Sequence, residues 1–281
     1  MTEISAELTG EGTPAEVFFY RMDLSYVGTK YHGWQSQPSG RGIQDEVERA
    51  LGIIVRHKIR IQSASRTDTG VHAEQQVCTF KTAFPFNEYK WKQGLNGLMD
   101  ESIRVKSIHL ASTDFHPIIS SNGKAYRYRI IKSDVDSPFF QPFCWRVYGP
   151  LNVDLIVSEA ASFVGEHDFT SFCASDSNAK SKVRKVLEIK VADRGPLIDI
   201  WVVGEGFLKQ MVRNIVGTLV AVGAGRIPPG SVPKIFAAKD RRAAPKTAPA
   251  QGLTLVKIFY DRLQSADSLI FEASQGFTQS I

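Results

Sequence analysis

The chain has 281 residues, of which 43% are hydrophobic, and this is enough for one large or two moderate domains with a sizeable core. No apolar run approaches the roughly 20 residues that span a bilayer. Segment 1–7 also lacks the basic start of a signal peptide, so we expect a cytoplasmic protein with no membrane partner. The net charge of +5 and the isoelectric point near 9.0 favour an acidic partner. Three widely separated cysteines suit neither a disulfide framework nor a metal knuckle, and we expect Cys78, Cys144 and Cys173 to be reduced and buried.

The first half of the chain alternates between strand and helix patterns. Residues 1–16 are polar and aperiodic, and we expect them to be poorly ordered. Residues 18–26 alternate apolar and polar side chains, as a strand with one buried face does, and residues 43–54 place apolar side chains at helical spacing. The elements predicted after these are strand-like segments at 59–62 and 76–81, a helix at 87–98 and a strand at 103–110.

The second half repeats this succession. Asn152 is the predicted N-cap of a helix whose apolar face extends to Val164, and Ser231 the predicted N-cap of a short helix with Pro233 in its first turn. A longer helix carries an apolar stripe from Leu208 to Val222. Strands are predicted at 124–131, 183–191, 198–203 and 252–260.

Several of these strands follow one another without a crossover helix, which indicates an α+β fold with a mixed or antiparallel sheet. The two halves are similar sheet-plus-helix units. We therefore predict an N-terminal α+β domain at 17–112 and a C-terminal α+β domain at 113–260, flanked by a disordered segment at 1–16 and a poorly ordered tail at 261–281.

The stretch from Ser65 to Ala73 places an acid and an arginine in a glycine-containing turn between two strand-like segments. Gly70 lets the backbone reach positive φ, so Asp68 is displayed at the tip of a turn. Arg66 could keep that carboxylate ionised through charge-assisted hydrogen bonds, which suits a carboxylate that attacks a substrate. A salt-bridged surface turn would give the same spacing, and spacing alone favours that interpretation.

The wording of this stretch resembles the Gly-Arg-Thr-Asp-Ala-Gly-Val-His signature of the tRNA pseudouridine synthase A family. Further blocks resemble the family in the same order along residues 17–260, and several ordered blocks are far more specific than one short motif. These blocks are Tyr26–Gln35, Ile43–Glu46, Phe115–His116 with Lys124–Tyr128, Asp168–Phe172, Met211–Gly217, Ala238–Arg241 and Thr247–Leu253.

The resemblance implies a pseudouridine synthase fold, in which the two halves form one extended sheet with a central RNA-binding cleft. It implies an isomerase that converts uridine to pseudouridine in the anticodon stem-loop of tRNA, without a cofactor and as a homodimer. Asp68 would be the nucleophile, Arg213 its salt-bridge partner and Tyr126 the residue that stacks on the target uracil. Leu253 would form an apolar wall of the pocket. Arg66 would guide the flipped base or pair with Asp68, and one arginine could do both.

Basic residues cluster in this sequence, and the clusters with interleaved aromatic residues suit phosphate contact and base stacking. One cluster runs from Lys209 to Lys246, where Asp240 is the lone acid, and another surrounds Tyr126. Many such residues form only a solvated face. The residues predicted to contact RNA are Lys124, Lys209, Lys239 and Arg241, together with Tyr126 and Leu253.

Two other interpretations stay open: a non-catalytic tRNA-binding or chaperone protein of the same fold, and a nucleoside or glycoside hydrolase that uses Asp68. The hydrolase is disfavoured because no second carboxylate has an assigned acid role. No metal site is predicted, because His72 and His116 lack partners at ligand spacing. The chain also departs from the family pattern, with Ile118 in place of an RNA-facing arginine and Ser65 and Thr69 in place of glycine and alanine.

Overall fold

A computed structural model describes residues 17–84, 87–133, 135 and 137–276. The predicted disorder at 1–16 lies outside the described residues. The described strands belong to one ten-stranded sheet. They are β1 (Phe18–Tyr26), β2 (Gln62–Ser63), β3 (His72–Thr82), β4 (Ile103–Leu110), β5 (Gly123–Lys132), β6 (Trp145–Val147), β7 (Gly165–Asp168), β8 (Val183–Arg194), β9 (Leu197–Gly204) and β10 (Leu253–Phe259).

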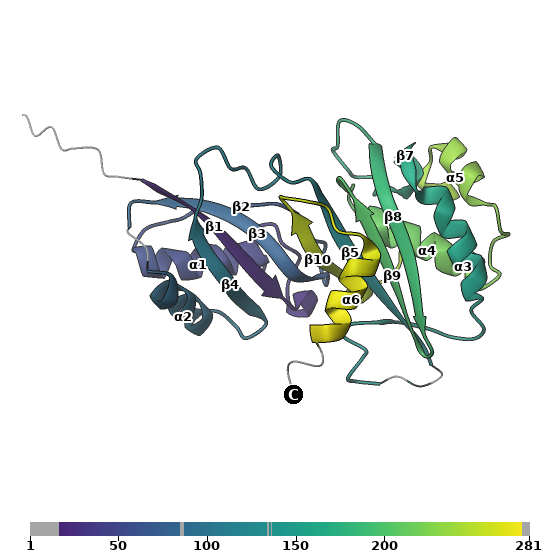
Figure 1. The fold of residues 1–281 in the computed structure, drawn as a ribbon, viewed down its shortest axis with the longest axis horizontal. Coiled ribbons are helices and arrows are strands. Elements are labelled where there is room, and N and C mark those ends of the chain that lie inside the picture. Colours follow the sequence, from purple (N-terminus) through teal and green to yellow (C-terminus); the bar gives the residue numbers. More distant parts are fainter. Residues whose placement is uncertain (1–16, 85–86, 134, 136, 277–281) are drawn as a thin grey trace, which may run out of the picture.

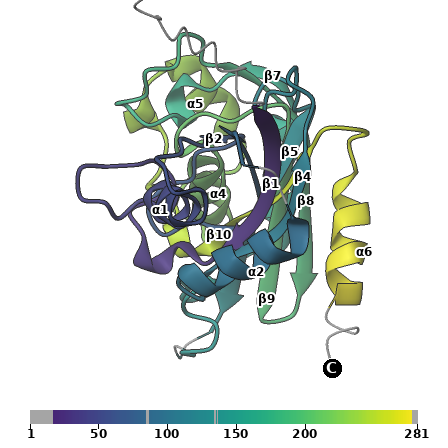
Figure 2. The ribbon, with the colours of Figure 1, turned by 90° about the vertical axis from the view of Figure 1, so that its left-hand side faces the viewer.

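Helices cover this sheet on both faces, with the C-terminal helix apart from the rest (Figures 1 and 2). The α-helices are α1 (Ile43–Val55), α2 (Glu88–Leu98), α3 (Val153–Ala160), α4 (Met211–Gly223), α5 (Val232–Ala238) and α6 (Ala266–Gly276). None of the described helices is both long and apolar enough to cross a membrane.

The two halves of the chain join within the sheet, whose main strand order is β4-β1-β3-β10-β5-β9-β8-β7. Strand β10 lies between them. It runs parallel to β3, with Thr254 opposite His72, and antiparallel to β5, with Leu255 opposite Tyr126. The prediction of a mixed α+β sheet that extends across both halves is therefore confirmed, and the last strand of the chain forms the seam.

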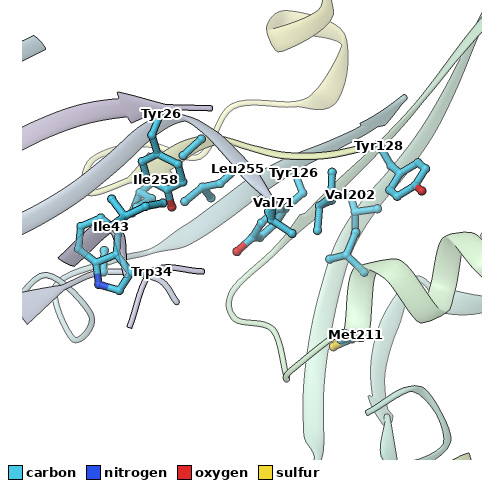
Figure 3. Close-up of a cluster of buried hydrophobic side chains, with 14 of the residues drawn as sticks. Tyr26, Trp34, Ile43, Val71, Tyr126, Tyr128, Val202, Met211, Leu255 and Ile258 are labelled. Carbon is cyan, nitrogen blue, oxygen red and sulfur yellow. The ribbon is translucent and has the colours of Figure 1, made fainter. Parts of the chain in front are cut away.

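Alternation along the strands divides the core between the two faces of the sheet. In β9, Ile200 and Val202 belong to the large core, whereas Trp201 and Val203 pack on the opposite face against Leu269 of α6. The large core is continuous across the seam, as Figure 3 shows. Its drawn members include Tyr26, Trp34 and Ile43 from the first half and Tyr126, Tyr128, Val202 and Met211 from the second.

Of the two predicted N-caps, Asn152 is confirmed and Ser231 is not, while Asn87, at the predicted start of its helix, is a further cap. The Asn87 side chain accepts a hydrogen bond from the Lys90 amide, and the Asn152 side chain accepts one from the Leu155 amide. Ser231 makes no cap, because its hydroxyl donates to the carbonyl of Pro228 instead.

The expectation of a poorly ordered tail is wrong for Ala266–Gly276, which forms α6. Ala266 and Leu269 are buried against the outer face of β9, and the Ala266 amide donates to the Glu188 carboxylate at 2.7 Å. This helix is hard to recognise from its own sequence, because its stability comes from the sheet face it covers.

The alternation at 59–62 does not form the full predicted strand. Ile59 and Ile61 are buried as the pattern requires, but pairing with β3 is limited to Gln62 and Ser63. The Ile61 amide donates to the Glu48 carboxylate of α1 at 3.1 Å. The Glu48 carboxylate therefore accepts the backbone hydrogen bond that a neighbouring strand would otherwise accept.

Two helix predictions also need correction at their ends. Helix α3 stops at Ala160 and continues as a short 3₁₀ turn to Phe163, so Val164 lies beyond it and is exposed. Helix α4 begins at Met211, and Leu208 precedes it. Phe163 and Leu208 are nevertheless buried, in a 3₁₀ turn and an irregular segment respectively.

Candidate active site

Asp68 lies in the loop between β2 and β3, which we call the Asp68 loop (residues 64–71). The Val71 amide donates to the Asp68 carbonyl at 3.1 Å, and Gly70 has a φ of +81°. The tight turn that the sequence predicts is therefore formed. The Trp34 amide also donates to the Thr67 carbonyl at 3.0 Å. One hydrogen bond within the loop and one from the segment before α1 therefore hold the loop backbone in place.

Two glycines allow that support to come so close. A side chain on Gly33 would place its Cβ 2.7 Å from the Thr67 carbonyl oxygen, and one on Gly28 would overlap the carbonyl of Val71. The backbone of the segment before α1 therefore lies directly against the backbone of the Asp68 loop.

The Asp68 carboxylate forms an ion pair with Arg213. Arg213 Nη1 donates to Asp68 Oδ2 at 2.8 Å, and Arg213 Nε donates to the Ala248 carbonyl at 2.8 Å. Both side chains are mostly buried, with exposed fractions of 14% for Arg213 and 23% for Asp68. A guanidinium fixed by a second acceptor holds the carboxylate at a defined position. Asp68 Oδ1 receives no hydrogen bond from any described residue.

Arg66 does not pair with Asp68. Its side chain is exposed at the wall of the cleft, and no described residue forms a hydrogen bond or ion pair with its guanidinium. The idea that Arg66 is a structural partner of Asp68 is therefore wrong, since Arg213 occupies that place. Arg66 is left with its charge available to a ligand.

Five side-chain contacts fasten the Asp68 loop and its exit to the second half of the chain, one of them from His72 Nε2 to the Pro142 carbonyl at 3.0 Å. Each joins a group at 64–72 to a group more than fifty residues away. The others are Lys124 Nζ to the Ala64 carbonyl at 2.8 Å, Ser65 Oγ with the Tyr126 hydroxyl at 2.9 Å, Arg213 with Asp68, and His72 Nε2 with the Gln251 carbonyl at 3.1 Å. The loop position thus depends on β5, on α4 and on the approach to β10.

Tyr126 lies in β5 with its hydroxyl buried beside the loop. Burial, reinforced by the nearby negative charge of Asp68, raises the pKa of Tyr126 to about 12. The phenol is therefore neutral at physiological pH. The ring of Phe207 stands edge-on to that of Tyr126, with the centroids 5.1 Å apart.

A cleft of about 1140 Å³ contains these groups. It is lined from both halves of the chain and combines an acid, basic residues and apolar side chains. Its lining includes Asp68, Arg66, Tyr126, Arg213, Lys124, Lys209, Leu253, Phe207 and Ile118. Pockets of this size commonly hold a small ligand or one extruded nucleotide with its neighbours.

The predicted RNA-binding lysines fall into different environments. Lys124 is half-buried in the cleft, and burial, together with the nearby charge of Arg184, lowers its pKa to about 8. Lys209 lines the cleft and pairs with Asp176 at 2.6 Å, but it precedes α4, whereas the stripe predicted from Leu208 would have placed it inside the helix. Lys239 ends α5 and pairs with Asp168 at 3.0 Å, outside the cleft lining.

The Arg241 guanidinium is occupied by hydrogen bonds to neighbouring groups of the protein. Its guanidinium donates to the Ala244 and Pro245 carbonyls and to the side chains of Asn214 and Thr247. The site brings together Asp68, Arg213, Tyr126, Lys124, Lys209, Leu253 and Arg66, whereas Lys239 and Arg241 are not part of its lining.

The two histidines are held by backbone groups. His72 Nδ1 accepts from the Gly28 amide at 3.1 Å, and His116 Nδ1 accepts from the amides of Ile118 and Ile119. Burial lowers the pKa of His72. Within the described residues there is no group of three His, Cys, Asp or Glu side chains that could hold a metal ion. The three cysteines are buried and free.

Sequence reasoning missed three members of this site. Gln76 is fully buried, accepts from the Ser65 amide at 3.2 Å and donates to the Ser65 carbonyl at 2.6 Å. Ser65 itself was noted only as a small residue, and Phe207 was not singled out. A glutamine on the apolar-facing side of β3 was the available signal, because a buried amide needs partners.

Comparisons with known proteins show the family of the chain. A family model described as tRNA pseudouridine synthase matches residues 160–261. The chain is 41% identical over 240 residues to tRNA pseudouridine synthase A of Geotalea daltonii, with 85% of this chain and 98% of the relative covered. It is 40% identical over 243 residues to that of Bacillus licheniformis, with 86% and 98% covered.

A relative of the same name from Myxococcus xanthus is 40% identical over 241 residues, with 85% of this chain and 91% of the relative covered. A solved structure of a Cbf5-Nop10-Gar1 complex has a TM-score of 0.35 and 13% identity, with 84% of this chain and 48% of that chain covered, too distant to bear on function. The alignments cover nearly the whole length of these relatives, and this shows the family. The chain therefore belongs to the tRNA pseudouridine synthase A family, which is a family of isomerases.

Proposed function

We propose that the protein converts uridines in the anticodon stem-loop of tRNA to pseudouridine, with Asp68 as the nucleophile. One observation carries this proposal: the Asp68 carboxylate is held at 2.8 Å by Arg213 inside a cleft that also contains the Tyr126 ring. The printed name of the relatives supplies the substrate class, and the resemblance of the motif around Asp68 supplies the stem-loop. We also propose, as the same resemblance implies, a cytoplasmic homodimer.

The reaction needs one nucleophile and no change of oxidation state. The bond between uracil N1 and the sugar carbon breaks, the base turns, and a bond from uracil C5 to the same carbon forms. The hydrogen at C5 leaves as a proton and N1 takes up a proton, so that substrate and product are isomers. Asp68 can serve by adding to the uracil ring or by capturing the sugar carbon. In both routes, the Arg213 ion pair holds the carboxylate at a fixed position for attack.

The target base must leave its stack before it reaches Asp68, which costs about a few kcal/mol. Arg66 is proposed to guide the extruded base or to fill the gap, because its guanidinium is exposed at the cleft wall and engaged by no described residue. Tyr126 is proposed to stack on the uracil, and Leu253 to close the apolar side of the pocket.

The basic residues are proposed to bind the phosphates of the RNA around this pocket. Lys124 and Lys209 lie in the cleft lining, and Lys239 is 65% exposed at its margin. Arg241 is proposed to act less directly, because its guanidinium already supports the loop that follows it.

The experiment uses an unmodified tRNA transcript that carries tritium at uridine C5. The wild type is expected to release tritium to water, and Asp68→Asn is expected to release none while binding tRNA within a few-fold of the wild-type affinity. Turnover by Asp68→Asn would refute the nucleophile. Tight binding without release by the wild type would favour the non-catalytic tRNA-binding protein, and free uracil in the product would favour the hydrolase.

Mapping the pseudouridines formed in the transcript tests the finer part of the proposal. Modified positions confined to the anticodon stem-loop are expected. Modification elsewhere would leave the chemistry of Asp68 in place and overturn the stem-loop assignment.

A further inference from the structure

The Tyr126 hydroxyl has one hydrogen-bond partner among the described residues, and that partner is Ser65 Oγ at 2.9 Å. The two residues lie 61 positions apart, one in β5 and one at the start of the Asp68 loop. Both line the cleft that contains Asp68, and both are nearly buried. The contact therefore sits within the cleft wall rather than in the distant core.

The Ser65 hydroxyl is itself held in place by its backbone. Gln76 accepts from the Ser65 amide at 3.2 Å and donates to the Ser65 carbonyl at 2.6 Å, so both peptide groups of Ser65 are fixed. A hydrogen bond between the Tyr26 hydroxyl and Thr67 Oγ1, at 2.8 Å, holds the loop two residues further along. Ser65 Oγ thus occupies a defined point to which the phenol is directed.

A phenol without this partner would face a cleft that also contains the Asp68 carboxylate. The negative charge of Asp68 acts on Tyr126 closely enough to raise the pKa of the phenol, and Asp68 Oδ1 receives no hydrogen bond from any described residue. A phenol O–H that turned to Asp68 would form a charge-assisted bond with the carboxylate and weaken it as a nucleophile. The ring would also leave its place beside Phe207.

We propose that Ser65 is a positioning residue, whose hydroxyl holds the Tyr126 hydroxyl so that the ring stays in the cleft wall and the Asp68 carboxylate stays free. This inference rests on the proposed function, because it assigns Ser65 a role in the same reaction. It assigns Ser65 no contact with the substrate. The effect of removing the hydroxyl should therefore be on rate and not on RNA affinity.

The first test is the single-turnover rate of tritium release. Ser65→Ala is expected to slow release about tenfold, as the loss of one buried hydrogen bond does, with unchanged affinity for the tRNA transcript. Ser65→Thr retains the hydroxyl and is expected to restore most of the rate. Ser158→Ala is the matched control, because that serine is exposed on α3, lies outside the cleft lining, and its hydroxyl bonds to no described residue. Its rate should equal that of the wild type.

The second test needs no turnover. Thermal unfolding of Ser65→Ala, Tyr126→Phe and the double variant forms a cycle, and the two single effects are expected to be non-additive, because each removes the same hydrogen bond. Additive effects on stability, or a Ser65→Ala rate equal to wild type, would overturn the inference. If the wild type itself released no tritium, the proposed function would fail instead, and the stability cycle would still decide whether Ser65 holds Tyr126.

Discussion

Arg213 and Asp68 meet across the seam of the sheet, 145 residues apart in the chain and 2.8 Å apart in the fold. The arginine comes from the first turn of α4 and the aspartate from the loop between β2 and β3. Each half of the protein therefore contributes one side of the pair, and neither half has a complete site.

Arg213→Lys should test the geometry of that pair separately from its charge. A lysine keeps the positive charge but cannot donate to Ala248 and Asp68 through two fixed N–H groups, as Arg213 does. We expect the single-turnover rate of tritium release to fall about tenfold or more, with tRNA affinity within a few-fold. Arg194→Lys, at the exposed end of β8, should leave the rate unchanged. Equal rates for the two variants would contradict the role given to Arg213.

Lys124 should give the protein a recognisable pH dependence. Its pKa is lowered from 10.5 to about 8, chiefly by burial, so between these values the folded protein has lost a proton that the unfolded chain keeps. The unfolded state then binds more protons, and stability rises with pH in this window. The free energy of unfolding of the wild type, relative to Lys124→Met, should therefore increase from about pH 8 to about pH 10. Urea unfolding at several pH values measures this, and a flat difference would contradict it.

Gly28 should tolerate no side chain. A Cβ at Gly28 would overlap the Val71 carbonyl, so Gly28→Ala must displace either the Asp68 loop or the segment that follows β1. We expect both a lower melting temperature and a severe loss of tritium release. Gly97→Ala is the matched control: Gly97 lies in α2 with no atom within 4 Å of an added Cβ, so alanine should be neutral or stabilising by about 0.5–1 kcal/mol. A wild-type rate for Gly28→Ala would show that the loop does not depend on this close packing.

Leu269 of α6 should matter for stability alone. Its side chain is 2% exposed and packs with Trp201 on the sheet face opposite the core that contains Tyr126. Leu269→Ala is expected to cost about 2 kcal/mol of unfolding free energy, at the low end for buried leucine because the helix is peripheral. The rate of tritium release at a temperature where both proteins are folded should be unchanged. A slower rate without a loss of stability would reveal a link between α6 and the cleft.

Local patterns in the sequence predict the elements of this fold well. The Asn87 and Asn152 caps, the alternation of β1 and the stripe of α4 depend on neighbours within a few residues, which a single sequence displays. Helix α6 escaped prediction because the surface that stabilises it, around Trp201, lies more than sixty residues earlier in the chain.

The site was less predictable from the residues themselves. The partner of Asp68 was inferred from a family resemblance, while the nearer arginine, Arg66, fits the sequence spacing equally well and proved not to pair with Asp68. The Ser65 contact with Tyr126 depends on β5 lying one strand from β3, and the insertion of β10 between them sets that separation. Pattern reading supplies residue types and spacings, whereas these pairings follow from strand order.

The central position of β10 also affects how the protein matures during synthesis. Strands β3 and β5 do not pair directly, and β10 (residues 253–259) joins them within the sheet. A ribosome must therefore deliver almost the whole described chain before the Asp68 loop and Arg213 acquire a common framework. A nascent chain stalled before β10 would hold both halves of the ion pair and still lack a working cleft, so tRNA modification would begin only once the seam is closed.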